Sequence, residues 1–404
     1  MTTMTKMITM KKNTTMTTDL RPDNFYCSQK FTWLSADFEK KLLYSCCSAQ
    51  PESVDLTWVD QHPDQLFNTN NLLKEREQML NNQVVESCHV ACWLPESNNL
   101  PSRRTQMKTW RMTHTNTHVE HPEILNLILG KTCNLTCVYC CKQYSSAWTK
   151  DILNNGIYLE DPRFLLTTQD RLLSKTSQPE LENSNSYKKM LQAVLHFGAV
   201  DKIIISGGEP FLFNNLPDLL NELSDAKSIN ITTGLGVDPK RLEKMIARIN
   251  NKSNLQISVS IENCDNFYEF VRYDNAWSRF TTNMTLLQDN GLSIGLMSTL
   301  SNLTVFGFID FYQRFCDYPK FYSFVNDPDF LAVNVLDPTS KKIMIKMLES
   351  TKIEIKDKLI NGMNKDCDEQ QRQNFSSYLK QFASRRNLSL DLYPNSMLQW
   401  LDLI

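Results

Sequence analysis

The strongest constraint on the fold of this chain is a cluster of cysteines. Residues 131–143 read KTCNLTCVYCCKQ and hold four of the twelve cysteines of the 404-residue chain. The first 19 residues are rich in Thr and Met and lack the apolar segment of a secretory signal, so we expect a disordered leader at 1–19 and a cytoplasmic protein. Because disulfides are rare in the cytoplasm, clustered cysteines there more often bind metal. The stretch therefore predicts a metal centre.

The composition narrows the range of partners. The formal net charge is −2, and no apolar run in the sequence approaches the length of a membrane span. The sequence also lacks a P-loop, a G-x-G-x-x-G motif and a basic patch interleaved with aromatic residues. We therefore expect no nucleic-acid partner and no membrane association.

From about residue 121, short apolar runs alternate with helical patterns. We expect strands at 123–129, 202–207, 229–234, 255–261, 292–300 and 330–336. Repeated β–α alternation favours a parallel sheet with helical crossovers, and six units are fewer than a closed eight-fold barrel needs. The predicted fold class is α/β. It comprises a cysteine-rich module at 20–115, a partial (β/α)6 barrel at 116–337 and a helical C-terminal extension at 338–404.

Three of the clustered cysteines have the spacing of an iron–sulfur loop. Cys133, Cys137 and Cys140 form C-x3-C-x2-C directly after the first expected strand, at the end where parallel folds place their sites. Three thiolates on four irons leave one iron open for catalysis. A zinc site takes four ligands, and the adjacent Cys141 is a poor fourth one.

Two motifs together resemble the radical S-adenosylmethionine (SAM) superfamily. CNLTCVYC resembles its cluster loop, including the aromatic Tyr139, and IIISGGEPF at the end of the second expected strand resembles its GGEP motif. The resemblance implies a [4Fe–4S] cluster on the three cysteines. It also implies SAM binding by the GGEP loop, where paired glycines let the backbone approach a ligand. That loop consists here of Gly207, Gly208, Glu209 and Pro210.

Later strand ends continue the resemblance. ITTGLG stands where relatives carry a Thr-Asn-Gly turn, and SVSIEN has Glu where Asp is usual. Arg272 is expected to pair with the SAM carboxylate or to lie on the surface. The implied SAM-binding positions are Thr233, Ser258, Ser260, Glu262, Arg272 and Ser298.

A second group of cysteines precedes the expected barrel. FYCSQKFTWL…LLYSCC resembles the start of a group of twitch-domain radical SAM proteins, in which a strand and hairpin end in Pro-Cys-Cys; here Ser45 replaces the proline. Related twitch and SPASM modules bind an auxiliary Fe–S cluster, usually C-terminal to the barrel. The implied ligands are Cys27, Cys46, Cys88 and Cys92, with Cys47 as the alternative to Cys46 and structural zinc as the alternative metal.

The resemblance implies a radical SAM enzyme. Reductive cleavage of SAM at the cluster would give a 5′-deoxyadenosyl radical that abstracts hydrogen from a substrate, with an electron donor such as flavodoxin or ferredoxin. Relatives with auxiliary modules often modify peptides, so a peptide or protein side chain is the expected substrate and a small molecule the alternative. Two other interpretations stay open. One is a non-catalytic Fe–S or zinc protein, and the other is a degenerate family member without turnover.

Overall fold

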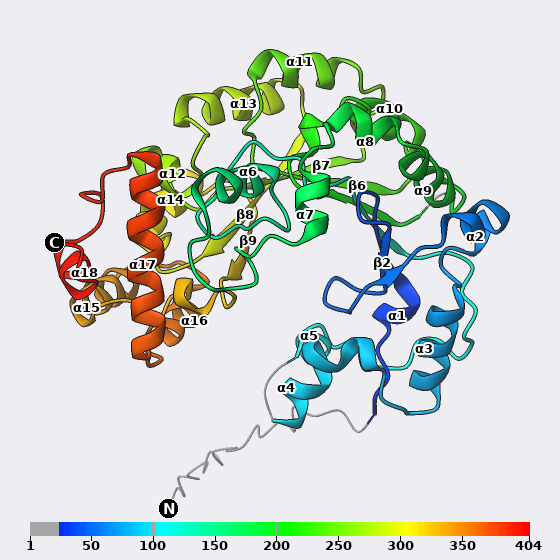
Figure 1. Ribbon diagram of the computed structural model, residues 1–404, viewed down its shortest axis with the longest axis horizontal. Helices are drawn as coiled ribbons and strands as arrows, with labels where there is room; N and C mark the ends of the chain where they lie inside the picture. Colours follow the sequence, from blue (N-terminus) through cyan, green and yellow to red (C-terminus); the bar gives the residue numbers. More distant parts are fainter. Residues whose placement is uncertain (1–23, 99–101, 199) are drawn as a thin grey trace, which may run out of the picture.

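A computed structural model describes residues 24–98, 102–198 and 200–404, so the expected leader at 1–19 lies outside the described residues. One nine-stranded sheet forms the centre, in the order β3-β2-β1-β4-β5-β6-β7-β8-β9 (Figure 1). The strands are β1 (Trp33–Asp37), β2 (Leu42–Tyr44), β3 (Glu52–Ser53), β4 (Ile124–Ile128), β5 (Lys202–Ser206), β6 (Ser228–Thr233), β7 (Leu255–Ser260), β8 (Ser293–Leu300) and β9 (Lys320–Phe324).

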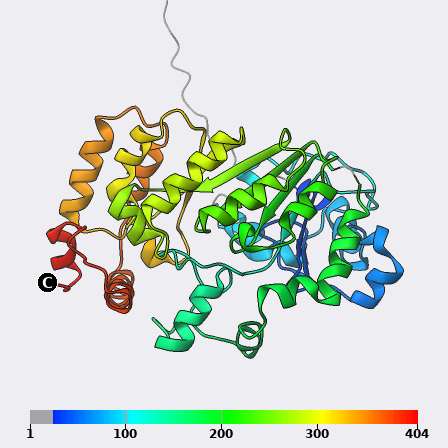
Figure 2. The same ribbon diagram turned by 90° about the horizontal axis from the view of Figure 1, so that it is seen from above.

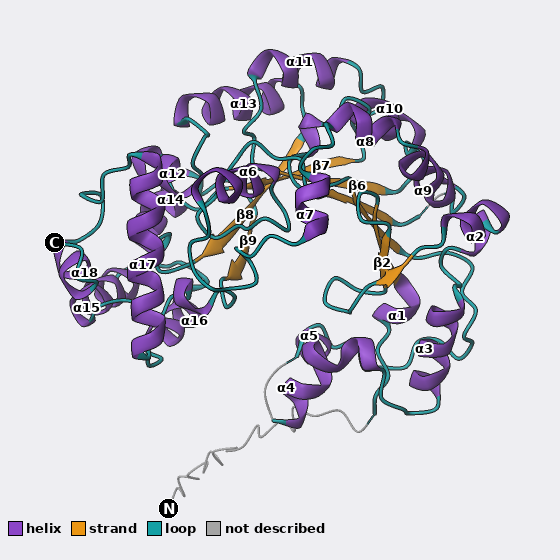
Figure 3. Ribbon diagram, viewed as in Figure 1, coloured by secondary structure: helices purple, strands orange, loops and turns teal. Residues whose placement is uncertain are grey.

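The six strands β4 to β9 are parallel, as a partial (β/α)6 barrel requires. Along β4, β5 and β6 a buried aliphatic residue alternates with a half-buried one, because the buried face packs against helices. Helices α9, α10, α11 and α13 lie along the outer side of the curved sheet (Figure 3). The helices of this region are α6 (Ser146–Asn155), α7 (Thr168–Leu173), α8 (Gln178–Asn183), α9 (Asn185–Leu195), α10 (Leu216–Glu222), α11 (Pro239–Ala247), α12 (Asp265–Val271), α13 (Trp277–Asp289) and α14 (Phe308–Arg314).

The N-terminal segment extends the sheet of the barrel. Strand β1 pairs in parallel with β4, with Ser35 opposite Asn126, and β2 turns back antiparallel to β1. The helices of this segment lie together beside the first strands (Figure 1). They are α1 (Gln29–Thr32), α2 (Leu56–Gln61), α3 (Asn70–Leu80), α4 (Leu94–Ser97) and α5 (Arg103–Gln106).

The sixth barrel strand is β9, so the prediction of a strand at 330–336 is wrong. Its apolar side chains instead fill the core from a non-strand segment that begins with a 3-10 turn at Asp329–Leu331, and Phe330, Leu331, Val333, Val335 and Leu336 are buried. The ring of Phe330 lies 5.3 Å from that of Tyr378 in the C-terminal helices. Strand β9 is the edge of the sheet and alternates between half-buried and exposed residues, which explains its weaker apolar signal.

The C-terminal extension is helical, as predicted. Its helices are α15 (Pro338–Glu349), α16 (Lys356–Met363), α17 (Glu369–Arg386) and α18 (Asn395–Trp400). The segment with α6 and α7, in cyan and green, projects on one side of the sheet in the view from above (Figure 2). Within the described ranges, no helix combines the length and apolar character needed to span a bilayer.

Candidate functional site

The three cysteines of the C-x3-C-x2-C motif lie on the loop between β4 and α6, here called the cluster loop (residues 129–145). Cys137 is buried, and Cys133 and Cys140 are partly buried. Burial, with the neighbouring Cys137 thiol and Glu209, raises the pKa of Cys133 to about 12. Burial and the thiols of Cys137, Cys141 and Cys133 raise the pKa of Cys140 well above its ordinary value. The three thiols therefore lie close together in a place that disfavours free thiolates, whereas bound metal would stabilise them.

The first turn of α6 fixes the shape of the cluster loop. The Ser145 hydroxyl donates to the carbonyl of Leu135 at 2.7 Å, and the Ser146 hydroxyl accepts from the backbone N–H of Cys133 at 3.1 Å. The indole of Trp148 donates to the carbonyl of Cys137 at 3.1 Å. The sequence SSAW at 145–148 thus positions two of the three cysteines.

The C-terminal extension also contacts the cluster loop, which the sequence did not predict. The hydroxyl of Tyr378 donates to the carbonyl of Val138, and the guanidinium of Arg386 donates to the Thr136 hydroxyl at 3.2 Å. Both side chains come from α17, eight residues apart, and are buried. The helical spacing places them on one face of α17, but nothing in the sequence identified the loop as their partner.

The GGEP loop packs directly on the cluster loop. The backbone N–H groups of Gly208 and Glu209 donate to the carbonyls of Gly130 and Thr132, each at 2.8 Å. A Cβ at Gly208 would lie 2.3 Å from the Thr132 oxygen, and Gly207 has a φ of +127°. The glycines are therefore required for the contact between the two loops. The sequence predicts that these glycines give a ligand access to the backbone. The structure shows that they allow the close packing of the GGEP loop on the cluster loop.

Glu209 joins the GGEP loop to the end of β6. Its buried carboxylate accepts the Thr233 hydroxyl at 2.8 Å and the Gly234 N–H at 3.0 Å. Burial raises its pKa, although these hydrogen bonds oppose the change. Pro210 begins a short 3-10 turn, Pro210–Leu212. Glu209 therefore links the GGEP loop to the end of β6 through its carboxylate and to the cluster loop through its backbone N–H.

Arg272 lies inside the protein beside the cluster loop. Its guanidinium forms an ion pair with Glu262 at 2.6 Å and donates toward the sulfur of Cys137 at 3.7 Å. The hydroxyl of Tyr139 donates to Glu262 at 2.8 Å. The expectation of a solvated surface arginine is wrong, because Glu262 compensates the buried charge. Pairing of Arg272 with the SAM carboxylate stays a prediction.

The three expected serines occupy neighbouring strand ends. Ser258 and Ser260 of β7 lie two residues apart and so share one face of the sheet. Ser298 of β8 is buried and donates to the carbonyl of Ile261 at 2.7 Å. The structure thus places all three on the strands next to Glu262.

Three cysteines of the second group, Cys27, Cys88 and Cys92, pack in one buried apolar cluster. Cys27, Cys46, Cys88 and Cys92 are buried, whereas Cys47 is exposed. Burial, against the opposing charge of Lys30 and together with the thiols of Cys27 and Cys92, raises the pKa of Cys88 to about 12. A hydrogen bond with Cys47, burial and the Cys88 thiol raise the pKa of Cys46. Cys46 is therefore the member of the Cys46–Cys47 pair that faces the other thiols.

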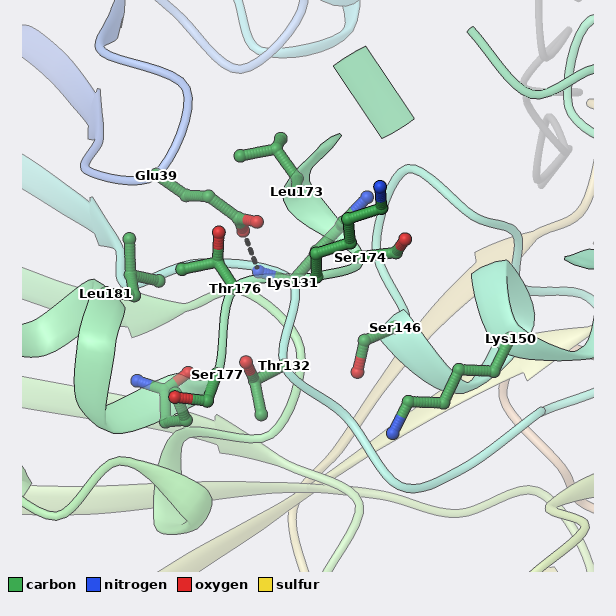
Figure 4. A pocket seen from close by; sticks show the side chains of 12 residues that line it. Glu39, Lys131, Thr132, Ser146, Lys150, Leu173, Ser174, Thr176, Ser177 and Leu181 are labelled. Atoms are coloured by element: carbon green, nitrogen blue, oxygen red, sulfur yellow. Dashed lines mark hydrogen bonds between the residues drawn. The ribbon is translucent and has the colours of Figure 1, made fainter. Parts of the chain in front are cut away.

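Two cavities adjoin the cluster loop. One of about 450 Å³ is bounded by the β1–β2 hairpin, the ends of β4 and β5, and Cys47. The other, of about 380 Å³, lies under α7 and α8 and includes Thr132, Ser146 and Lys150 (Figure 4). Glu39 and Lys131 line both, and the Glu39 carboxylate accepts the Lys131 backbone N–H at 2.6 Å. The first cavity is therefore lined by Cys47 and by residues from both ends of the cluster loop.

In the part of the chain that the structure describes, no three His, Cys, Asp or Glu side chains are arranged around a single metal ion. A [4Fe–4S] cluster has a different requirement, since each thiolate binds its own iron. Three thiols on one loop, close to each other and backed by an arginine, fit that requirement.

Comparison with known proteins identifies the class. The family model of the radical SAM superfamily matches residues 127–311. Residues 127–311 therefore form a radical SAM domain, as the motifs predicted. No curated protein matches the chain.

Solved structures with similarity to the chain include "Native anSMEcpe with bound AdoMet", at 14% identity and a TM-score of 0.31. That match covers 64% of this chain and 59% of the other, so the chain spans less than two thirds of the length of anSMEcpe. Streptococcus suis SuiB bound to S-adenosylmethionine matches at 12% identity and a TM-score of 0.31, covering 90% of this chain and 70% of SuiB. SuiB bound to the precursor peptide SuiA matches at 12% identity and a TM-score of 0.33, covering 88% and 75%.

Proposed function

We propose that this chain is a radical SAM enzyme that abstracts hydrogen from a peptide or protein side chain. The observation that carries the proposal is the direct packing of the cluster loop on the GGEP loop, through the hydrogen bonds from Gly208 and Glu209. When bound in such a site, a [4Fe–4S] cluster and SAM would supply a 5′-deoxyadenosyl radical, and the protein would supply position and exclusion of water.

The residues have distinct roles in this proposal. Cys133, Cys137 and Cys140 hold the cluster, and the first turn of α6 fixes their backbone. Arg272, held by Glu262, places a positive charge beside the Cys137 sulfur. The strand-end residues Thr233, Ser258, Ser260 and Ser298 are the proposed contacts of SAM.

The proposal includes an auxiliary Fe–S cluster on Cys27, Cys46, Cys88 and Cys92. Its support is the burial of these four thiols and their mutual effect on pKa. Structural zinc in the same thiols is the competing interpretation. The cavity of about 450 Å³ that is lined by Cys47 and both ends of the cluster loop is the proposed substrate site. Tyr144 on its wall is 63% exposed, so the cavity is open to a side chain of a larger substrate. A small-molecule substrate is the alternative.

The test is anaerobic purification and reconstitution of the native chain and of a Cys133/Cys137/Cys140→Ala variant. We expect about eight irons in the native protein and about four in the variant. With SAM and a reductant such as dithionite, or reduced flavodoxin or ferredoxin, only the native protein should form 5′-deoxyadenosine. Native protein that binds both clusters and forms no 5′-deoxyadenosine would indicate a degenerate member. Zinc in place of iron at all sites would indicate a non-catalytic metal protein.

A further inference from the structure

Lys30 is a buried lysine at the centre of the cysteine-rich segment. It is 1% exposed and forms an ion pair with Glu75 of α3. Its ammonium also donates to the hydroxyls of Ser45 at 2.5 Å and Ser87 at 2.8 Å. The Ser87 hydroxyl donates in turn to Glu75 at 2.5 Å. Glu75, Ser45 and Ser87 thus give the three ammonium protons an acceptor each.

The partners of Lys30 stand next to the candidate ligands. Ser45 directly precedes Cys46, and Ser87 directly precedes Cys88. Lys30 itself follows Cys27 by three residues, and its backbone N–H donates to the Cys27 carbonyl at 3.2 Å. Lys30 therefore joins three of the four segments that carry the proposed auxiliary ligands, two through its ammonium and one through its backbone.

A contribution to folding stability does not by itself explain the buried Lys30–Glu75 pair. Burying two charges is costly, and replacing a buried ion pair with apolar side chains of similar volume is often neutral or stabilising. The polar set is therefore better explained by the geometry that it imposes on the adjacent cysteines.

We propose that Lys30 and Glu75 form a clamp that positions Cys46 and Cys88 for metal binding. This inference rests on the proposed auxiliary site. Hydrogen bonds that orient the ligands of a metal typically contribute about 10–100-fold in metal affinity. The clamp acts on the backbone next to each sulfur atom, so Lys30 is a positioning residue.

A second buried ion pair has the same relation to the other two cysteines. Arg104 pairs with Glu96, which lies on α4 four residues after Cys92. Arg104 also donates to the carbonyl of Tyr26, the neighbour of Cys27, at 3.0 Å. The recurrence of a buried charge pair beside each pair of cysteines supports positioning as its role.

The test uses the full chain with Cys133, Cys137 and Cys140 changed to Ala, so that only the auxiliary site binds metal. In this parent the K30M/E75L variant should keep the unfolding midpoint of the apoprotein and lose metal affinity by about 10–100-fold in a chelator competition. The EPR spectrum of the remaining reduced cluster should also change. Equal affinity and an equal spectrum in variant and parent would overturn the clamp.

Serine variants separate positioning from folding. S45A/S87A keeps the ion pair and should weaken metal retention, whereas S45T/S87T keeps both hydroxyls and should restore it. The control S53A/S97A changes two exposed serines of the same segment and should retain metal as the parent does. Metal retention in S45A/S87A equal to that in S45T/S87T would contradict the proposal.

The outcomes also distinguish the clamp from the proposed function. A parent that binds neither iron nor zinc at the auxiliary cysteines overturns both. A parent that binds zinc overturns the auxiliary cluster. The clamp is then supported if K30M/E75L loses zinc affinity by the same factor, and it is overturned if the variant and the parent bind zinc equally. Iron binding that is strong in the parent and weak in K30M/E75L supports both.

Discussion

Arg272 and Glu262 form a buried ion pair beside Cys137, a candidate ligand of the cluster. Their side chains are 5% and 1% exposed, and the N–O distance is 2.6 Å. The pair joins the residue after α12 and the end of β7 to Tyr139 and Cys137 of the cluster loop. Removing one charge leaves the other buried and uncompensated.

We therefore expect Glu262→Gln to lower the free energy of unfolding by about 3–5 kcal/mol. Urea unfolding of the apoprotein measures this change. The control is Asp218→Asn, which breaks an exposed pair with Arg248 and should cost less than about 1 kcal/mol. A cost for Glu262→Gln no larger than for the control would show that the pair does not support the loop.

Gly208 sets the distance between the GGEP loop and the cluster loop. Alanine there would place a Cβ 2.3 Å from the Thr132 oxygen and 2.8 Å from the Lys131 carbonyl carbon, both backbone atoms. The loops must separate, so we expect Gly208→Ala to cost about 1–3 kcal/mol and to lower the affinity for SAM. Unfolding and equilibrium binding of SAM to the reconstituted protein measure the two effects.

Gly295→Ala is the matched control for this prediction. Its Cβ would meet Phe321 at 3.4 Å, the end of a flexible side chain, and we expect a smaller loss of stability. Equal effects of the two substitutions would mean that close packing of the loops does not depend on Gly208.

The sequence predicts the first five barrel strands to within one or two residues. Each is a short apolar or β-branched run, and the burial of side chains on the sheet produces that pattern. The prediction of the sixth strand is wrong because β9, as an edge strand, needs fewer apolar residues than the core segment that follows it. The pairing of β1 with β4 is a long-range contact that periodicity cannot reveal.

The sequence likewise predicts some features of the candidate site and not others. Local motifs identify Cys133, Cys137, Cys140 and the GGEP loop, because their spacing is set within one loop. The partners of Glu209 and Arg272 depend on how strand ends meet in space, so their positions could be predicted but their contacts could not. The contact of Tyr378 with the cluster loop joins residues 240 positions apart, and no local signal marks it.

Tyr378 and Tyr393 offer a comparison of two buried hydroxyls. The hydroxyl of Tyr378 donates to the Val138 carbonyl, whereas that of Tyr393 has no hydrogen-bond partner among residues 24–98, 102–198 and 200–404. We expect Tyr378→Phe to cost about 1–3 kcal/mol because it leaves a buried carbonyl unsatisfied. Tyr393→Phe should be neutral or stabilising, as it removes a buried polar group without a partner. Urea unfolding of the two variant apoproteins measures both changes in the free energy of unfolding. An equal loss in the two variants would refute the assigned role of Tyr378.

Asp170 joins α7 to both flanks of the cluster loop. Its carboxylate lies 3.6 Å from the Lys131 ammonium and 2.5 Å from the Lys142 ammonium. Burial raises the pKa of Asp170, but hydrogen bonds from Lys142 and Thr167 outweigh burial and lower it to about 2. An unfolded aspartate titrates near pH ~3.9, so the stability from ionised Asp170 is complete above about pH 4. It is lost as the pH falls toward the folded pKa of about 2.

We therefore expect Asp170→Asn to reduce the loss of stability between about pH 4 and pH 2, because the substituted amide does not titrate. Urea midpoints of the apoprotein across this pH range measure the slope. The control Asp225→Asn changes an exposed aspartate outside the site and should keep the slope of the parent. If Asp170→Asn and the parent lose stability equally on acidification, the carboxylate does not tie α7 to the loop.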